Sequence, residues 1–164
     1  MTFVAWRVRP RFRLPESLNW PFNFSLSTEF AFPRKVYDEN GVTLEVRPIL
    51  ERNFDRLQLC MNPVIGRALK GPGTKDGWDF EPSMRIGYAV NKRLDASLEY
   101  YGSVGALTGF HRTDDQVHLL FPGWDFKFSD KVIWNFGIGF AATPAGNQLV
   151  YKMRLGVLFG KERP

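Results

Sequence analysis

Apolar and polar residues alternate along nine stretches of this 164-residue chain, and the alternation continues for an unusual length. In residues 149–159 every second residue from Leu149 to Phe159 is apolar, and Lys152 and Arg154 lie between them. Successive side chains of a β-strand point to opposite faces, so a period of two predicts a strand. Strands of soluble proteins average about five or six residues. Several stretches here extend for about ten, the length that a tilted strand needs to cross a bilayer.

The alternation predicts strands throughout the chain and no long helix. Each predicted strand has an apolar face and a polar face. The predicted strands cover residues 2–13, 22–32, 42–50, 56–65, 78–90, 94–104, 116–128, 132–142 and 149–159. The seventh changes phase near Pro122-Gly123, which predicts a β-bulge at that position. Central strands of soluble sheets rarely accept proline, yet four prolines besides Pro122 fall inside the predicted strands: Pro10, Pro48, Pro63 and Pro82.

The connections between the predicted strands alternate between short and long. Tight turns lie at residues 52–55, 91–93 and 129–131, and longer loops lie at 33–41, 67–77 and 105–115. Outer-membrane barrels sort their connections in this way, with short turns on the periplasmic side and longer loops outside. Because bacterial single-chain barrels have even strand numbers, nine strands predict that residues 1–164 are the C-terminal portion of a larger barrel. An odd number of strands and a signal peptide would then precede them.

Composition narrows the classes of protein that this chain can belong to. Aromatic residues make up 15% of the chain, which suits strands and membrane interfaces. No run of about 18 apolar residues occurs, so we expect no membrane-spanning helix. The single cysteine, Cys60, excludes an internal disulfide and a cysteine-based metal site, and we expect no cofactor. The 22 Lys and Arg residues are dispersed, so we expect no nucleic-acid partner.

The polar faces of the predicted strands hold charged residues that would line the interior of a barrel. Charges in a narrow lumen must be paired or hydrated. Two interpretations remain open: a polar pore whose arginines attract anionic solutes, and a salt-bridged interior that fills the barrel. The predicted lumen-lining residues are Arg7, Arg9, Arg11, Arg13, Glu29, Glu45, Arg47, Glu81, Arg85, Glu99, Lys152 and Arg154.

Catalytic chemistry finds little support in the sequence. A hydrolase set of His111 with Ser103 and the nearby aspartates can be drawn, but the spacing does not support it and no nucleophile elbow is present. Glu81 and Glu99 could face each other on adjacent strands as a paired-carboxylate site. Arg85 lies two pleats along and favours an ion-pair ladder instead. His111 and His118 are the only candidates for histidine acid–base chemistry, and we expect no enzyme.

Tryptophan and tyrosine residues near the strand ends or on apolar faces admit two interpretations. In a membrane barrel they form girdles at the interfaces. In a soluble β-sandwich or calycin-like barrel they lie in the core. The residues concerned are Trp6, Trp20, Trp78, Trp134, Tyr100 and Tyr151. The two interpretations differ in the face that holds Phe22, Phe24, Phe80, Phe136 and Tyr151, which would point inward in a soluble barrel.

Six short segments suggest a family. They are GPG at 71–73, GWDFEP at 77–82, LEYYGS at 98–103, HLLFP at 118–122, WNFGIGF at 134–140 and LVYK at 149–152. Together they resemble uncharacterised Gram-negative outer-membrane β-barrel proteins of porin-like or transporter-like type, over residues 3–159. The resemblance implies a barrel in the bacterial outer membrane, and it brings no catalytic motif. The final strand, ending on Phe159, resembles the C-terminal assembly signal of such barrels, although residues 160–164 continue beyond it.

The sequence as a whole predicts one all-β domain over residues 1–164, an antiparallel up-and-down meander of about nine strands forming most of a transmembrane β-barrel. We expect an integral outer-membrane protein, either a channel or porin-like transporter for small solutes or a closed structural barrel. Its expected partners are outer-membrane lipids and, during insertion, the barrel-assembly machinery. The alternative is a soluble β-barrel that binds a small hydrophobic ligand.

Overall fold

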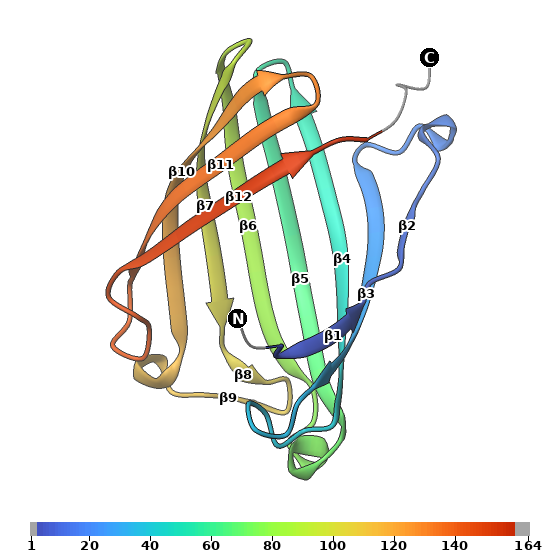
Figure 1. The fold of residues 1–164 in the computed structure, drawn as a ribbon, viewed down its shortest axis with the longest axis vertical. Coiled ribbons are helices and arrows are strands. Elements are labelled where there is room, and N and C mark those ends of the chain that lie inside the picture. The colour runs from blue at the N-terminus through green and yellow to red at the C-terminus, as the bar shows by residue number, and fades with distance from the viewer. Residues whose placement is uncertain (1–2, 160–164) are drawn as a thin grey trace.

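The strands form one antiparallel sheet in the computed structural model, which describes residues 3–159 (Figure 1). The long strands are β3 (Asn23–Pro33), β4 (Val42–Phe54), β5 (Leu57–Lys70), β6 (Asp79–Asn91), β7 (Leu94–Ser103), β10 (Val117–Ser129), β11 (Val132–Ala141) and β12 (Val150–Val157). The short strands are β1 (Ala5–Val8), β2 (Arg11–Arg13), β8 (Gly105–Ala106) and β9 (Gly109–Phe110). Three single 3-10 turns are η1 (Glu16–Leu18), η2 (Pro72–Lys75) and η3 (Thr113–Asp115). Among these residues, no helix is long and apolar enough to cross a membrane.

The long strands pair with their neighbours in chain order, which confirms the predicted all-β, antiparallel, up-and-down meander. The order across the sheet is β1-β3-β4-β5-β6-β7-β10-β11-β12. The turns β4–β5, β6–β7 and β10–β11 gather at the top of Figure 1, together with the longer β2–β3 connection at residues 14–22, and the other long loops gather at the bottom. The predicted sorting of short and long connections is therefore present. Thr2, at the start of the first predicted strand, and the tail 160–164 lie outside the described residues.

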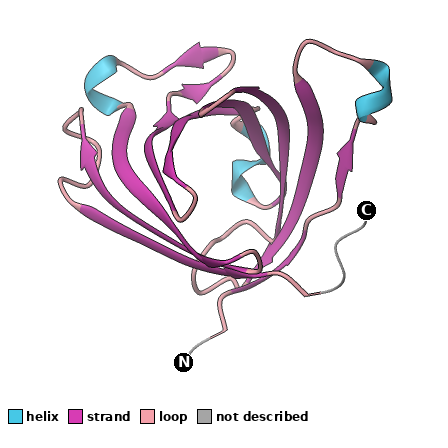
Figure 2. Cartoon of the chain, turned by 90° about the horizontal axis from the view of Figure 1, so that it is seen from above, coloured by secondary structure: helices cyan, strands magenta, loops and turns pink. Residues whose placement is uncertain are grey.

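The sheet curls around a central space without closing (Figure 2). Within residues 3–159, β1 and β2 pair only with β3, and β12 pairs only with β11, so two edges are free. Both edges run from the long-loop end to the short-turn end, because an even number of antiparallel steps separates them. Direct pairing of these edges would place a parallel pair, which is slightly less stable per residue, in an otherwise antiparallel sheet.

The first predicted strand is interrupted at Pro10. Val8 lies opposite Phe30 in β3, and Arg11 lies opposite Ser27, so β1 and β2 pair with β3 without a shift of register. Pro10 has no backbone N–H to donate. Its carbonyl still accepts a hydrogen bond from the backbone N–H of Thr28 at 3.1 Å. The two short strands are therefore consecutive parts of one edge strand.

Three further prolines form a row across the middle of the sheet. Pro63 in β5 lies opposite Pro82 in β6. The pairing of β4 with β5 is interrupted between Val46 and Leu50, and the register is the same on both sides of this interruption. Continued through it, the register places Pro48 beside Pro63. Because proline cannot donate to a ladder, the row accounts for the gap. The long strands continue through it, since pairing resumes on both sides.

The predicted bulge at Pro122-Gly123 is wrong. Both residues pair with β7 in continuous register, and the register of β10 with β11 shifts instead between Lys127 and Ser129. The apparent change of phase arises because Phe121 is an apolar residue on the inward face, where it is buried. Apolar residues on both faces removed the alternation from the sequence without changing the geometry of the strand.

Two strands and one loop also differ from prediction. The third and fourth predicted strands end at residues 50 and 65, whereas β4 reaches Phe54 and β5 reaches Lys70. The turn between β4 and β5 is consequently only Asp55-Arg56, with Asp55 at a φ of 49°. Inside the third predicted loop, β8 and β9 form a small hairpin, and β8 pairs with the start of β6.

Burial in this sheet is the reverse of that in a soluble protein. Five buried residues are polar or charged, namely Ser27, Glu29, Glu99, Asp125 and Asn135. Large apolar side chains are exposed, including Met153 at 71%. Soluble domains rarely bury carboxylates and usually bury most of their large apolar side chains. The packed centre of this molecule is therefore largely polar, and it lies on the inner side of the curled sheet. The buried apolar residues are Val64, Ala68, Val104 and Phe121.

Candidate functional site

The inner side of the sheet encloses a polar cavity of about 420 Å³. Its lining comes from β2, β4, β5, β6, β7, β10, β11 and β12. Both free edges and the middle of the sheet therefore contribute to one space, which identifies it as the interior. Nearly all of its side chains are polar or charged, and Ile49 and Ile133 are the aliphatic exceptions.

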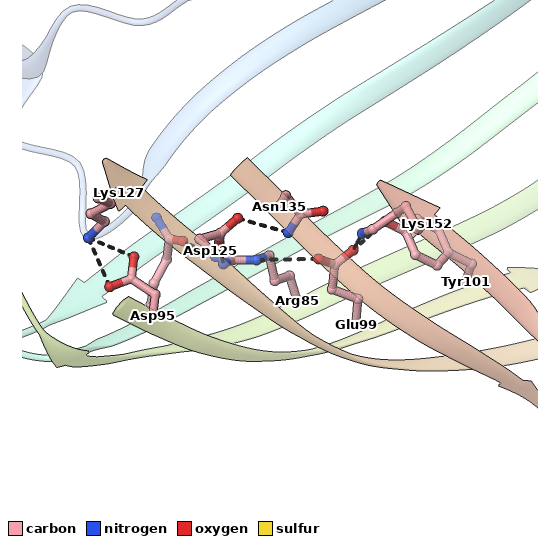
Figure 3. A network of polar contacts seen from close by, with 9 residues as sticks. Arg85, Asp95, Glu99, Tyr101, Asp125, Lys127, Asn135 and Lys152 are labelled. Atoms are coloured by element: carbon pink, nitrogen blue, oxygen red, sulfur yellow. Dashed lines mark hydrogen bonds and ion pairs between the residues drawn. The ribbon is translucent and has the colours of Figure 1, made fainter. Parts of the chain in front are cut away.

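A network of ion pairs lies beside this cavity (Figure 3). Arg85 in β6 is opposite Glu99 in β7, with the Nε of Arg85 3.7 Å from Oε1 of Glu99. Arg85 also forms an ion pair with Asp125 in β10. The side-chain amide of Asn135 in β11 donates to Oδ1 of Asp125 at 2.8 Å. Four adjacent strands therefore hold one continuous set of charged and polar groups.

Glu99 is the centre of this network. It accepts hydrogen bonds from the Lys152 ammonium group and from the hydroxyl of Tyr101, and it is 5% exposed. Lys152 belongs to β12, and β10 and β11 lie between it and Glu99. Its ammonium nitrogen lies 5.6 Å from the ring centroid of Phe121. The Lys152 side chain thus extends over two strands to reach its partner.

Glycines in β11 provide the space that this arrangement needs. Gly137 and Gly139 occupy inward positions of β11 next to Asn135. A Cβ atom on Gly139 would lie 2.3 Å from the ring of Phe121. A Cβ atom on Gly137 would lie 3.7 Å from Cε of Lys152. The absence of side chains at these positions allows Phe121 to fill the interior and Lys152 to pass above it.

We expect Gly139→Ala to destabilise the folded protein by about 1–3 kcal/mol, because Phe121 is buried and its ring must move. Gly156→Ala in β12 is the matched control, since the nearest atom to its Cβ would be 3.7 Å away. Urea unfolding of both variants, followed by tryptophan fluorescence, measures the difference. Equal unfolding midpoints for the two variants would contradict this account of Gly139.

Further ion pairs lie at both ends of the interior. Near the short turns, Lys127 pairs with Asp95 at 2.8 Å. Near the long loops, Glu29 is the partner of Arg9, whose Nε donates to it at 2.6 Å, and of Arg7 at 3.4 Å. The register places all twelve predicted lumen-lining residues on the inward face. The alternation also places Asp95 and Asn135 on polar faces of predicted strands, but sequence reasoning missed Asp125 and Lys127, which lie in the seventh predicted strand.

The two catalytic groupings that the sequence analysis considered and disfavoured are not assembled among the described residues. Glu99 lies opposite Arg85 and not opposite Glu81, so the register separates the two carboxylates. In the described part of the chain, the His111 side chain has no hydrogen bond to Ser103 or to the neighbouring aspartates. His118 lies on the outward face, where its Nδ1 is 2.7 Å from the hydroxyl of Tyr100.

The outward face of the sheet is apolar. Phe136 lies opposite Met153, Leu98 lies opposite Ile86, and this pattern continues from strand to strand. The register places four of the five discriminating aromatic side chains, Phe24, Phe80, Phe136 and Tyr151, on this face, and Tyr151 is among its most exposed residues. Phe22, just before β3, lines an apolar hollow with Leu50, Met61 and Ile86 of the same face. No charged side chain lies at the middle outward positions of the described strands. Arg52 and Arg67, closer to strand ends, lie over the rings of Phe54 and Trp78.

Aromatic side chains gather toward the two ends of this face. Near the long loops lie Trp6, Trp78, Tyr100 and Tyr151. Near the short turns, Trp134 stacks on Phe126 with ring centroids 5.4 Å apart. Trp20 precedes β3 at the same end and contacts Phe22 with centroids 5.6 Å apart.

Comparison of the chain with models of protein families, with curated proteins and with solved structures finds no match. The resemblance to outer-membrane barrels that the six sequence segments suggest stays a prediction. The site is a polar, ion-paired interior behind an apolar outer face, and its function must be argued from that geometry.

Proposed function

We propose that the protein is an integral β-barrel protein of the bacterial outer membrane whose polar interior admits small hydrophilic solutes. One observation carries the proposal: the polar side chains of the sheet are enclosed and the apolar side chains are exposed. Water penalises an exposed apolar surface, whereas hydrocarbon does not. Contiguous apolar patches of more than a few hundred Å² mark contacts with membranes or other proteins.

The distribution of aromatic and charged residues supports the same environment. Trp and Tyr are enriched at the two interfaces of a membrane, and here they gather toward the ends of the outward face. Arg52 and Arg67 lie close enough to strand ends for their guanidinium groups to reach the interface. The soluble alternative needs an apolar interior to hold a hydrophobic ligand, and the interior here is charged.

A closed structural barrel is the second candidate. The network around Glu99 favours it, because Lys152 and Phe121 occupy the interior over β10 and β11. The cavity of about 420 Å³ favours entry of small solutes from the short-turn end. The proposed function requires that water and small solutes reach at least this cavity.

Cysteine labelling in vesicles tests the orientation of the two faces. Cys60 lines the interior cavity, and Met153 lies on the outward face. In lipid vesicles, we expect a membrane-impermeant maleimide to label Cys60 of the native chain. We expect the same reagent to leave Met153→Cys, in a Cys60→Ser background, unlabelled until urea unfolds the protein. Water fills the interior around Cys60 in the first case, and lipid covers the outward position 153 in the second.

The opposite labelling pattern would refute the membrane proposal. A soluble barrel would expose position 153 to the reagent, because Met153 is 71% exposed in the absence of lipid. Lys131→Cys, in the turn between β10 and β11 and again in the Cys60→Ser background, is the control for reagent access, since an exposed turn reacts in either case.

A further inference from the structure

Positive charge is concentrated in the short-turn half of the interior. The cavity of about 420 Å³ is lined by five cationic side chains and three carboxylates. The cations are Arg11, Arg47, Arg85, Lys127 and Arg154, and the carboxylates are Glu51, Asp95 and Asp125. A second cavity of about 310 Å³ in the long-loop half has the opposite balance, with five carboxylates and two arginines. The excess of cations is therefore a local property of one half.

Two of the three carboxylates of the short-turn cavity are already paired with two of its cations, and the third, Glu51, forms no ion pair within the described residues. Asp125 pairs with Arg85, and Asp95 pairs with Lys127. Among the residues that the structure describes, Arg11 and Arg154 form no ion pair. These two guanidinium groups line the cavity without a carboxylate of their own.

Arg47 is only partly satisfied. One of its terminal nitrogens lies 2.7 Å from Oε1 of Glu45, on the same strand. Its Nε is buried and has no hydrogen-bond partner within the described residues. A buried N–H group without an acceptor loses its hydrogen bonds to water and forms none in the protein, and this raises the free energy of the folded state. An acceptor from outside the chain would remove that cost.

The register brings two of these arginines to either side of one small residue. Arg11 in β2 and Arg47 in β4 both lie opposite Ser27 in β3. Ser27 is only 2% exposed. Strands are about 4.8 Å apart, so arginine side chains from β2 and β4 can converge above Ser27. Arg154 extends into the same cavity from β12, at the other free edge.

We infer that Arg11, Arg47 and Arg154 form a binding site for a small soluble oxyanion, a phosphate or a carboxylate. Guanidinium groups present paired N–H donors that match the oxygens of such anions. An anion between them relieves the repulsion of neighbouring positive charges and supplies an acceptor for Nε of Arg47. The inference rests on the proposed function, because the anion must enter the interior from water.

Cys60 is a native reporter for this site, since it lines the same cavity and is the only cysteine. The full chain in phosphatidylcholine vesicles is treated with a sulfonate-bearing or a trimethylammonium-bearing methanethiosulfonate at fixed ionic strength. Rates are divided by those of a free thiol. We expect the anionic reagent to react about tenfold faster than the cationic one, because a charged cleft concentrates ions of opposite sign. Inorganic phosphate should slow the reaction of the anionic reagent with Cys60 more than chloride does.

Charge variants distinguish an effect of the arginine site from an effect of the overall electrostatic potential of the protein. Arg11→Gln and Arg154→Gln should each reduce the anionic preference several-fold, whereas Lys131→Gln in the exposed β10–β11 turn should leave it unchanged. Thr43→Cys, in a Cys60→Ser background, places the reporter in the long-loop cavity, which Thr43 lines. There the cationic reagent should react faster.

The outcomes distinguish the inference from the function on which it rests. If neither reagent labels Cys60, the interior is closed to solutes and the proposed function fails. Labelling without an anionic preference, or a preference that survives both arginine substitutions, overturns the anion site alone. If the preference of Cys60 for the anionic reagent is lost only when phosphatidylglycerol is mixed into the vesicles, the arginines bind a lipid head group. That result also overturns the site for a soluble anion.

Discussion

Glu99→Gln is expected to lower the free energy of unfolding by up to about 3–5 kcal/mol, because it leaves the partly buried cations Lys152 and Arg85 without the carboxylate that they share. Glu99 is buried and accepts from Lys152 and Tyr101 while it faces Arg85. Glutamine has nearly the same shape, so the loss reports the charge and not the packing. Urea unfolding in detergent or in vesicles, followed by tryptophan fluorescence, measures the effect.

Glu51→Gln is the matched control for this change. Glu51 also faces the interior, but within the described residues its carboxylate accepts a single 3.3 Å hydrogen bond, from the side-chain amide of Asn53. We expect its substitution to change stability by less than about 1 kcal/mol. The double variant Glu99→Gln/Lys152→Gln should recover part of the loss, since it removes both partners. A loss at Glu99 no larger than that at Glu51 would mean that the network is a weak, hydrated ion pair.

Most of the fold could be predicted because period-two patterning follows directly from strand geometry. One polar and one apolar face per strand located the nine pairing segments and the two kinds of connection. The failures occurred where a residue broke the pattern for a reason that only neighbouring strands explain. Phe121 is apolar on a polar face because it packs against Gly139, which belongs to the next strand.

Residue faces could be predicted, but residue partners could not. The alternation of side chains along each strand placed Arg85, Glu99 and Lys152 on the inner face. It could not join Lys152 to Glu99, because that contact crosses β10 and β11 and depends on the curvature of the sheet. The glycines of β11 carry a signal of this contact, since Gly137 and Gly139 occupy inward positions where other strands have long polar side chains.

Leu98→Arg separates the membrane proposal from the soluble alternative more sharply than any change in the interior. Leu98 is at the centre of β7, between Ile86 and Pro122 on the outward face, and it is 47% exposed. At an exposed position of a soluble protein, such a substitution changes stability by about 0.5 kcal/mol or less. At the midplane of a bilayer, arginine on the lipid face of a barrel costs about 2–4 kcal/mol.

Phe128→Arg is the control for depth. Phe128 is also apolar and is 67% exposed, but it lies at the register shift of β10, one residue from the end of the strand and next to the short turn. A membrane protein would lose only about 0–1 kcal/mol there, because the guanidinium group reaches the interface. Unfolding free energies of both variants in phospholipid vesicles give the comparison. Both side chains are exposed and apolar. A large loss of stability at residue 98 with a small loss at residue 128 therefore requires surroundings whose polarity changes from the middle of the sheet to its short-turn end. Equal small losses would mean that water surrounds both positions, and the apolar face would then need another partner.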